Sequence, residues 1–312
     1  METAGIIGGS GFIGSYLTRR FLDGGYKVRV SATDISRKDK YAHLLAMPGS
    51  DRLEIVPLNT QDVSALTAFV KGCDILVHGG TPFVLDVADP QADMFDPTVK
   101  GTENFLRVVQ EEGGARKVVF IASVASYNAA FPFPNEHQPS DHVYTEDDTP
   151  FVHDSHLPYG QAKHYADQAV RAFVKGHPDL PYEVVSVFPT LVVGKPLSGR
   201  EDSTSAGIQH LFKHRIAANP MVEMLLADDV PFAMVDVNDV ADCIFKAATT
   251  PGLHGRNYLL SSESWRVSDI SLMLNGQPPA GTPRSVYSGA RATRDLGVEF
   301  TSPRVPLGAY SS

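Results

Sequence analysis

Cysteine is scarce in this sequence of 312 residues, which contains only Cys73 and Cys243. The two lie far apart, and neither has a second cysteine or a metal-ligand spacing nearby. This excludes a framework of disulfides and a cysteine-based metal site. Each is therefore expected to be a small buried residue in a protein of a reducing compartment.

Basic residues are also in deficit, with 27 Lys and Arg against 36 Asp and Glu and a formal net charge of −9. That balance argues against nucleic acid or an anionic membrane as a partner, while a local basic pocket for a phosphate stays compatible with it. Long apolar runs are missing too. The opening METAGIIGGSGFIG is interrupted by glycines too early for a signal peptide or a membrane span, so a cytoplasmic protein is expected.

What the sequence does contain is a regular alternation of short apolar runs and longer amphipathic stretches. The apolar runs predict buried strands, and the stretches between them predict helices. Such alternation is typical of an α/β protein with a doubly wound parallel sheet, the Rossmann fold, covered by helices on both faces. The predicted strands are 4–8, 26–32, 53–58, 74–79, 117–123 and 182–188, and the predicted helices are 12–23, 38–47, 62–71, 97–112 and 159–175.

Two long irregular segments, 124–156 and 194–231, interrupt the alternation. Both follow the carboxyl ends of predicted strands, where doubly wound sheets bind ligands, and segments of this length usually carry function or disorder. The chain beyond 263 is expected to be largely loop, without a final helix. The expected division is a nucleotide-binding domain over 1–189, to which 232–262 returns, and a smaller substrate-binding region made of 190–231 and 263–312.

A glycine-rich turn, GGSGFIG, directly follows the first predicted strand and precedes a helix. Glycine permits the tight turn, the close approach of a pyrophosphate to backbone N–H groups, and close packing of the helix on the strand. In this position the turn predicts dinucleotide binding. The residues expected to contact the cofactor here are Gly8, Gly11, Phe12, Ile13 and Gly14.

A second motif lies in LPYGQAKHYADQAV, which places Tyr159 and Lys163 one helical turn apart on the same face. Alone this spacing is weak evidence, because a chain with 11 tyrosines produces it by chance. The surrounding sequence supplies the context. GGSGFIGSYL, VVFIASVAS and YGQAK together resemble the GxxGxxG, VFxSS and YxxxK motifs of the extended short-chain dehydrogenase/reductase superfamily, in the same order. The resemblance implies a catalytic site of Ser123, Tyr159 and Lys163.

Within that superfamily the sequence is most similar to the dihydroflavonol-reductase-like and carbonyl-reductase branch, over residues 4 to about 262. The segments that carry this likeness are HGGTPF (78–83), PTVKGT (97–102), FPTLVVGKP (188–196) and FAMVDVNDVADC (232–243).

The chemistry implied is reduction of a carbonyl group, whose oxygen needs a proton as hydride reaches the carbon. Tyr159 is expected to be the general acid/base, and the Lys163 ammonium and a positive nicotinamide are expected to favour its phenolate. The resemblance implies that Lys163 also binds the nicotinamide ribose and that Ser123 orients the substrate oxygen. A serine that only caps its own turn is the alternative for Ser123.

The resemblance implies further contacts with cofactor and substrate. Asn128 matches an asparagine that touches substrate in dihydroflavonol reductases, with a turn asparagine as the alternative. No metal is expected, because the histidines of the 124–156 segment fit no single helix face. The remaining cofactor residues are Asn59 and Thr60 near the adenine, Gly79, Gly80 and Thr81 after the fourth strand, and Phe188, Pro189 and Thr190 against the nicotinamide.

The choice of cofactor depends on the end of the second strand. Ala32 occupies the position where NAD-selective relatives carry a carboxylate, and Thr33 the position where NADPH-using relatives carry an arginine. Arg37 and Lys38 follow, and they either reach a 2′-phosphate or form a solvated charge pair. Both cofactors are expected to be used, with NADP(H) weakly favoured.

The leading hypothesis is an NAD(P)-dependent reductase or alcohol dehydrogenase, monomeric or homodimeric, acting on a medium-sized, partly apolar molecule. One alternative is a sugar-nucleotide epimerase, with Lys195, Arg200, Lys213 and Arg215 as candidates for holding a diphosphate. Another alternative is a non-catalytic nucleotide sensor. Such relatives usually lose the Tyr or the Lys of the YxxxK motif, whereas this chain keeps both. The candidates for an apolar substrate cleft are Phe131, Phe133, Phe151, Leu191, Leu211, Phe212, Met221 and Met224.

Overall fold

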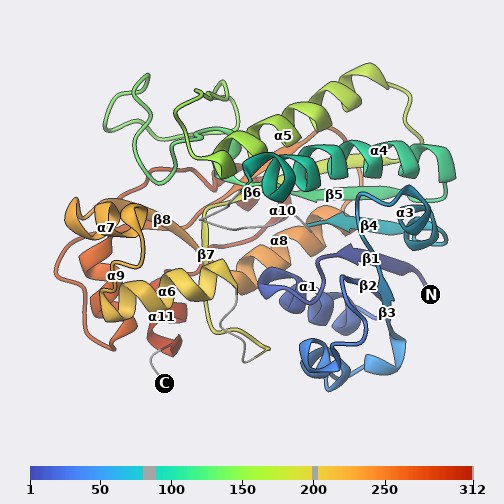
Figure 1. Ribbon diagram of the computed structural model, residues 1–312, viewed down its shortest axis with the longest axis horizontal. Helices are drawn as coiled ribbons and strands as arrows, with labels where there is room; N and C mark the ends of the chain where they lie inside the picture. Colours follow the sequence, from blue (N-terminus) through green and yellow to red (C-terminus); the bar gives the residue numbers. More distant parts are fainter. Residues whose placement is uncertain (80–88, 199–202, 311–312) are drawn as a thin grey trace.

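The computed structural model describes residues 1–79, 89–198 and 203–310. Its centre is a seven-stranded parallel sheet in the order β3-β2-β1-β4-β5-β6-β9, which confirms the expected doubly wound α/β fold (Figure 1). Each predicted strand is present, with ends within two residues of the prediction. The strands are β1 (Thr3–Ile7), β2 (Lys27–Ala32), β3 (Leu53–Pro57), β4 (Ile75–His78), β5 (Lys117–Ile121), β6 (Glu183–Pro189) and β9 (Asn257–Leu260).

Helices cover both faces of this sheet, as continuous apolar strands require. On one face α1 (Phe12–Asp23) packs beside α8 (Val237–Thr249), with Phe21 and Ile244 fully buried between them and the sheet. On the other face lie α3 (Val63–Val70), α4 (Gly101–Glu112) and α5 (Pro158–Gly176). Burying each large aliphatic side chain in these layers contributes roughly 1.5–3 kcal/mol.

Two predicted helices differ in detail. The stretch 38–47 is a 3₁₀ turn, η1 (Lys38–Lys40), followed by the short helix α2 (Ala42–Leu45). The helix predicted from 97 begins earlier, because a π-helix, η3 (Gln91–Lys100), runs directly into α4.

A smaller lobe, at the left of Figure 1, is built on a three-stranded sheet in the order β10-β8-β7. Trp265 and Phe212 are fully buried at its centre. The strands are β7 (Leu191–Val193), β8 (Pro231–Asp236) and β10 (Glu263–Arg266), and the helices are α6 (Thr204–His214), α7 (Pro220–Ala227), α9 (Val267–Leu274) and α11 (Arg304–Tyr310).

The return of the chain to the large sheet begins later than expected. The segment 232–262 was expected to return as a whole, but β8 pairs with β7 and β10, so only α8 and β9 rejoin the nucleotide-binding layers. The expectation of a loop-like end is also wrong. Val267, Ile270 and Leu274 recur at helical spacing and are buried along α9, and α10 (Ala290–Leu296) and α11 are too short for periodicity to reveal them.

The long segment after β5 is fastened by the C-terminal part of the chain. The N–H of Tyr144 donates to the carbonyl of Val286 (2.8 Å), the N–H of Ser288 donates to the carbonyl of Tyr144 (2.9 Å), and the rings of Tyr144 and Tyr287 stack with centroids 4.9 Å apart. We call residues 286–291 the C-terminal anchor. It joins segments that are more than a hundred residues apart in the chain.

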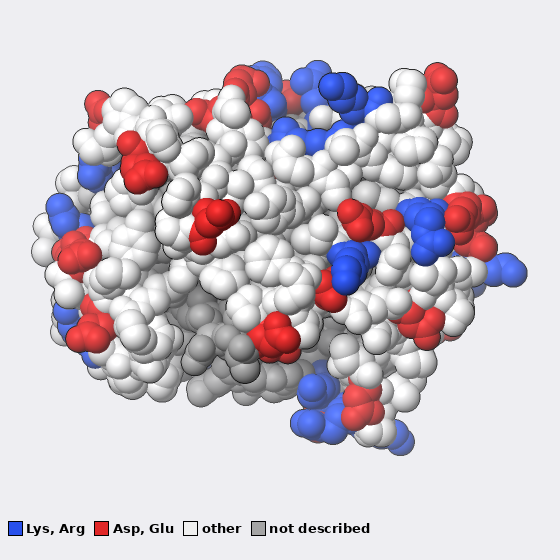
Figure 2. Space-filling model, turned by 45° about the horizontal axis from the view of Figure 1, so that its top comes forward, with Lys and Arg blue, Asp and Glu red and all other residues white. Residues whose placement is uncertain are grey.

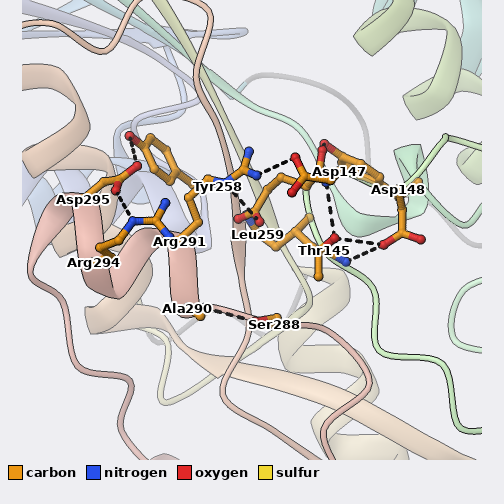
Figure 3. A network of polar contacts seen from close by, with 12 residues as sticks. Thr145, Asp147, Asp148, Tyr258, Leu259, Ser288, Ala290, Arg291, Arg294 and Asp295 are labelled. Carbon is orange, nitrogen blue, oxygen red and sulfur yellow. Dashed lines mark hydrogen bonds and ion pairs between the residues drawn. The ribbon is translucent and has the colours of Figure 1, made fainter.

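Figure 3 shows the ionic part of this anchor. Arg291, at the start of α10, donates to the carboxylate of Asp147 (2.7 Å) and lies 3.5 Å from that of Glu146. The buried carboxylate of Glu146 also accepts the N–H of Leu259 on β9 (2.9 Å), and burial raises its pKa. The segment after β5 is therefore tied to α10 through Arg291 and to the edge of the large sheet through Glu146.

Charges of both signs are interspersed over the face of the molecule drawn in Figure 2. In the described ranges, no helix is long and apolar enough to cross a membrane.

Cys73 and Cys243 are free and buried, as expected. Burial raises the pKa of the Cys73 thiol to about 11, which makes it a poor nucleophile.

Candidate active site

The glycine turn joins β1 to α1 and leaves the first N–H groups of the helix facing the carboxyl edge of the sheet. Gly8 has a φ of 85°, and the N–H of Gly11 donates to its carbonyl (3.0 Å). A Cβ atom on Gly14 would lie only 2.0 Å from the Gly8 carbonyl oxygen, so glycine is required for this close approach of helix and turn. Gly11 is exposed. The turn therefore fits the pyrophosphate of a dinucleotide, with Phe12 and Ile13 in the first turn of α1 beside it.

The residues expected near a 2′-phosphate lie together after β2. Thr33, Arg37 and Lys38 are all exposed, and Lys38 opens the turn η1. The guanidinium of Arg37 already pairs with the carboxylate of Asp39 (2.9 Å). A phosphate at this position would therefore compete with Asp39 for Arg37.

Of the residues expected near the adenine, Asn59 is exposed after β3, and its side-chain oxygen accepts the N–H of Gln61 (3.0 Å). Thr60 is half-buried beside it, against Gly101 at the start of α4. Gly79 follows β4 and lines a cleft at the carboxyl edge of the sheet. Gly80 and Thr81 lie outside the described residues.

Ser123, Tyr159 and Lys163 line that same cleft. Ser123 lies two residues after the end of β5, and its Oγ accepts the N–H of Ala125 (3.2 Å), so it does cap its own turn. It also forms a side-chain hydrogen bond with Tyr159. Lys163 presents its Nζ 5.8 Å from the centroid of the Tyr159 ring. Ser123 therefore caps its own turn, which was the alternative role, and also lies beside Tyr159 as expected of the catalytic serine.

The first turns of α5 are pressed against the segment after β5. A Cβ atom on Gly160 would lie 2.3 Å from the carbonyl oxygen of Ala129, so the helix could not approach this closely with any other residue there. The hydroxyl of Ser126 donates to the carbonyl of Lys163 (3.0 Å). These contacts fix the distance between the serine at the strand end and the helix that carries the tyrosine and lysine.

Burial sets the protonation of the pair. Burial raises the pKa of Tyr159 to about 12, against the opposing effect of its hydrogen bond with Ser123. Burial lowers the pKa of Lys163 to about 8. Stabilisation of the phenolate by Lys163 stays a prediction, because the groups that shift the pKa of Tyr159 here are its buried surroundings and Ser123. At neutral pH Tyr159 carries its proton and Lys163 is mostly charged, which suits donation of a proton to a substrate.

Apart from these polar groups the cleft, of about 170 Å³, is largely apolar. Among the candidates for an apolar cleft, Phe131, Leu191 and Met221 line it, whereas Phe212 is fully buried in the small lobe and Met224 is exposed. The sequence reasoning missed other lining residues, which come from four separate segments: Met94, Leu157, Ser205, Ile208 and Phe232.

Two residues expected to contact a ligand, Phe188 and Asn128, pack or hydrogen-bond within the protein and do not line the cleft. Phe188 is fully buried with its ring 5.0 Å from that of Tyr127, while the next two residues of its segment, Pro189 and Thr190, line the cleft. Asn128 is 2% exposed and does not line the cleft. Its amide oxygen accepts the N–H of Ala130, and its amide nitrogen donates to the carbonyl of Phe133. The structure favours the turn asparagine.

The basic candidates for a diphosphate site lie elsewhere. Lys213 and Arg215 line a separate surface hollow beside α9, Lys195 is exposed, and Arg200 is outside the described residues. Among the described residues, Lys163 is the only Lys or Arg that lines the cleft. Residues 1–79, 89–198 and 203–310 also contain no cluster of three His, Cys, Asp or Glu suited to a metal ion.

Comparisons with known proteins agree with this geometry. A model of the NAD dependent epimerase/dehydratase family matches residues 4–261. Cinnamoyl-CoA reductase CAD2 of Medicago truncatula is 27% identical over 97% of this chain and 92% of that protein, and dihydroflavonol 4-reductase of Hordeum vulgare is 26% identical over 88% and 74%. The crystal structure of yeast methylglyoxal/isovaleraldehyde reductase Gre2 complexed with NADPH has the same fold, with a TM-score of 0.82 at 19% identity over 99% of this chain and 97% of that one.

Proposed function

The chain belongs to the NAD dependent epimerase/dehydratase family, the extended short-chain dehydrogenase/reductases, and on that premise we propose that it reduces an uncharged, partly apolar ketone or aldehyde. The observation that carries the proposal is the apolar cleft that ends at Ser123, Tyr159 and Lys163. A cleft of this kind favours an apolar substrate held by a few polar groups. The names of the relatives, cinnamoyl-CoA reductase and dihydroflavonol 4-reductase, support the same class of reaction.

The cofactor would be held by the glycine turn, by Gly79 and by Lys163, and when bound it would supply hydride to the carbonyl carbon. Ser123 would donate a hydrogen bond to the carbonyl oxygen and hold it beside the tyrosine. Tyr159, protonated at neutral pH, would donate its proton to that oxygen as negative charge develops there. The Lys163 ammonium would stabilise the phenolate that remains. The apolar walls would exclude water from these polar groups.

The substrate class is tested with a panel of carbonyl compounds and both nicotinamide cofactors, followed by nicotinamide absorbance. Aryl and branched alkyl ketones or aldehydes are expected to give a kcat/KM at least about tenfold above that of carbonyl compounds with a carboxylate or phosphate, because a charge would be desolvated in the cleft. Tight binding of a UDP- or GDP-sugar, without reduction of any apolar carbonyl compound, would turn the assignment to the epimerase.

We further propose that both cofactors are used, with NADP(H) weakly favoured through Arg37 and Lys38. Discrimination below about a hundredfold, or ~3 kcal/mol, is expected, because Asp39 competes for the Arg37 guanidinium. Arg37→Ala should raise the KM for NADPH about tenfold and leave the KM for NADH nearly unchanged. Lys27→Ala, an exposed lysine at the opposite end of β2, is the control and should change neither. A preference for NAD(H) above a hundredfold would show that Arg37 and Lys38 do not reach the phosphate.

A further inference from the structure

A second, smaller cavity of about 20 Å³ lies behind the cleft, between the large sheet and α5. Lys163 lines both cavities and is the only titratable residue among the described residues that does so. The other polar side chains around the small cavity are His78 on β4, Thr102 on α4, Asp167 on α5 and Ser186 on β6, all buried. The cavity is thus a polar chamber on the side of Lys163 that faces away from substrate.

His78 is the unusual member of this set. It is 3% exposed, and its Nε2 has no hydrogen-bond partner among the described residues. Its ring is held between Phe105 and Phe120, with centroids 4.8 and 5.5 Å away. Burial and the nearby charge of Lys163 lower the pKa of His78 to about 4, so the imidazole is neutral at physiological pH. A buried polar nitrogen without a partner costs free energy, and native proteins usually satisfy such atoms with a side chain or a water.

The chamber meets the requirements of a buried water. A water needs a cavity of roughly 10–15 Å³ or more and two to four polar partners. Asp167 uses one carboxylate oxygen to bind Arg171 (2.7 Å), which leaves the other available, and the Thr102 hydroxyl donates to the Thr98 carbonyl (2.7 Å), so its oxygen can still accept. A buried ammonium likewise needs acceptors around it.

We propose that this chamber binds one structural water that accepts a hydrogen bond from Nζ of Lys163 and donates one to Nε2 of His78, making His78 a positioning residue for Lys163. The inference rests on the proposed reductase function for its catalytic consequence, but not for the water itself. The water stabilises the ammonium of Lys163 from the side opposite Tyr159. The titratable groups that line the two cavities with this lysine are His78, Asp167 and Tyr159, and among the three His78 offers a neutral ring nitrogen as an acceptor.

The first test needs no activity and no variant. A crystal structure of the cofactor-free protein at about 1.5 Å resolution is expected to contain an ordered water within about 3.2 Å of both Nε2 of His78 and Nζ of Lys163. A dry cavity, or a water that contacts only one of the two atoms, would overturn the proposal.

The second test is the pH profile of kcat for carbonyl reduction, with the falling limb expected near the Lys163 pKa of about 8. His78→Leu removes the acceptor and should move that limb down by about one pH unit, which lowers kcat about tenfold on the limb and much less below it. His78→Gln, whose amide oxygen restores an acceptor, should return the limb to its original position.

Tyr182→Phe is the matched control, because it removes a buried polar atom that likewise has no partner among the described residues, at a residue that lines neither cavity. Its profile should not move. An unshifted limb in a folded His78→Leu protein would contradict the positioning role. If that variant does not fold, His78→Gln and the crystal structure decide. Absence of reductase activity in the unaltered protein would count against the proposed function, whereas the crystal structure would still decide the water.

Discussion

Replacing Tyr159 with phenylalanine is expected to lower kcat at least about a hundredfold while the affinity for the cofactor changes little. The phenol is the group that would give its proton to the substrate oxygen, and phenylalanine keeps the ring and its packing. Burial raises the pKa of Tyr159 to about 12, so the phenol keeps its proton at neutral pH, and Tyr159 is the only tyrosine among the described residues that line the cleft. Steady-state kinetics and cofactor titration by fluorescence measure both quantities.

Tyr165→Phe is the control for this experiment, since Tyr165 lies on the same helix but is 42% exposed and does not line the cleft. It should leave kcat within about twofold of the original. Turnover near the original value in the Tyr159→Phe protein would remove Tyr159 from the mechanism.

Adding a single methyl group at Gly160 is expected to have the second large effect. In Gly160→Ala the new Cβ would lie 2.3 Å from the carbonyl oxygen of Ala129 and 2.9 Å from its Cα. Both atoms are backbone, so neither can rotate away, and the start of α5 must move relative to the segment after β5, which carries Ser123. A displacement of about 1 Å between catalytic groups can cost about a hundredfold in rate. We expect kcat/KM to fall by about that factor and the free energy of unfolding to fall by about 1–3 kcal/mol.

Gly176→Ala tests whether this effect is specific to the contact. Gly176 ends the same helix, and a Cβ atom there would have no neighbour within 4 Å. Its unfolding free energy should stay within about 1 kcal/mol of the original, and its kinetics should not change. A Gly160→Ala protein with unaltered kinetics and unaltered stability would show that α5 can shift freely at this point.

The large sheet was predictable because each of its first six strands lies in a short run rich in apolar residues, and the glycine turn and the lysine–tyrosine pair are local motifs with fixed spacing. The small lobe was not predictable in this way. Its strands β7, β8 and β10 are short and come from separate parts of the chain, so their pairing depends on contacts that no local pattern contains. This is why the segment 232–262, which contains most of β8, was expected to return to the nucleotide-binding domain as a whole.

The placing of individual site residues was less predictable. Neighbouring residues of a strand point to opposite faces, so the ring of Phe188 is buried while Pro189 lines the cleft, and this alternation was available in the sequence. The role of Asn128 could not be predicted from the sequence, because its hydrogen-bond partners, Ala130 and Phe133, are defined only by the folded turn. His78 lay in a predicted strand and began HGGTPF, a segment that carries the likeness to the reductases, but no role was expected for it, since burial without a partner is a property of the folded protein.

The C-terminal anchor has a consequence for the order in which the protein matures. Phe131, which lines the cleft, packs against Tyr287 with ring centroids 5.8 Å apart, and Asp147 pairs with Arg291. At about 5–20 residues per second, a ribosome makes these partners several seconds after the glycine turn, the serine and the tyrosine. The glycine turn, the serine and the tyrosine are therefore synthesised before the residues that close the outer wall of the cleft, and this wall can form only after residues 286–291 have been made.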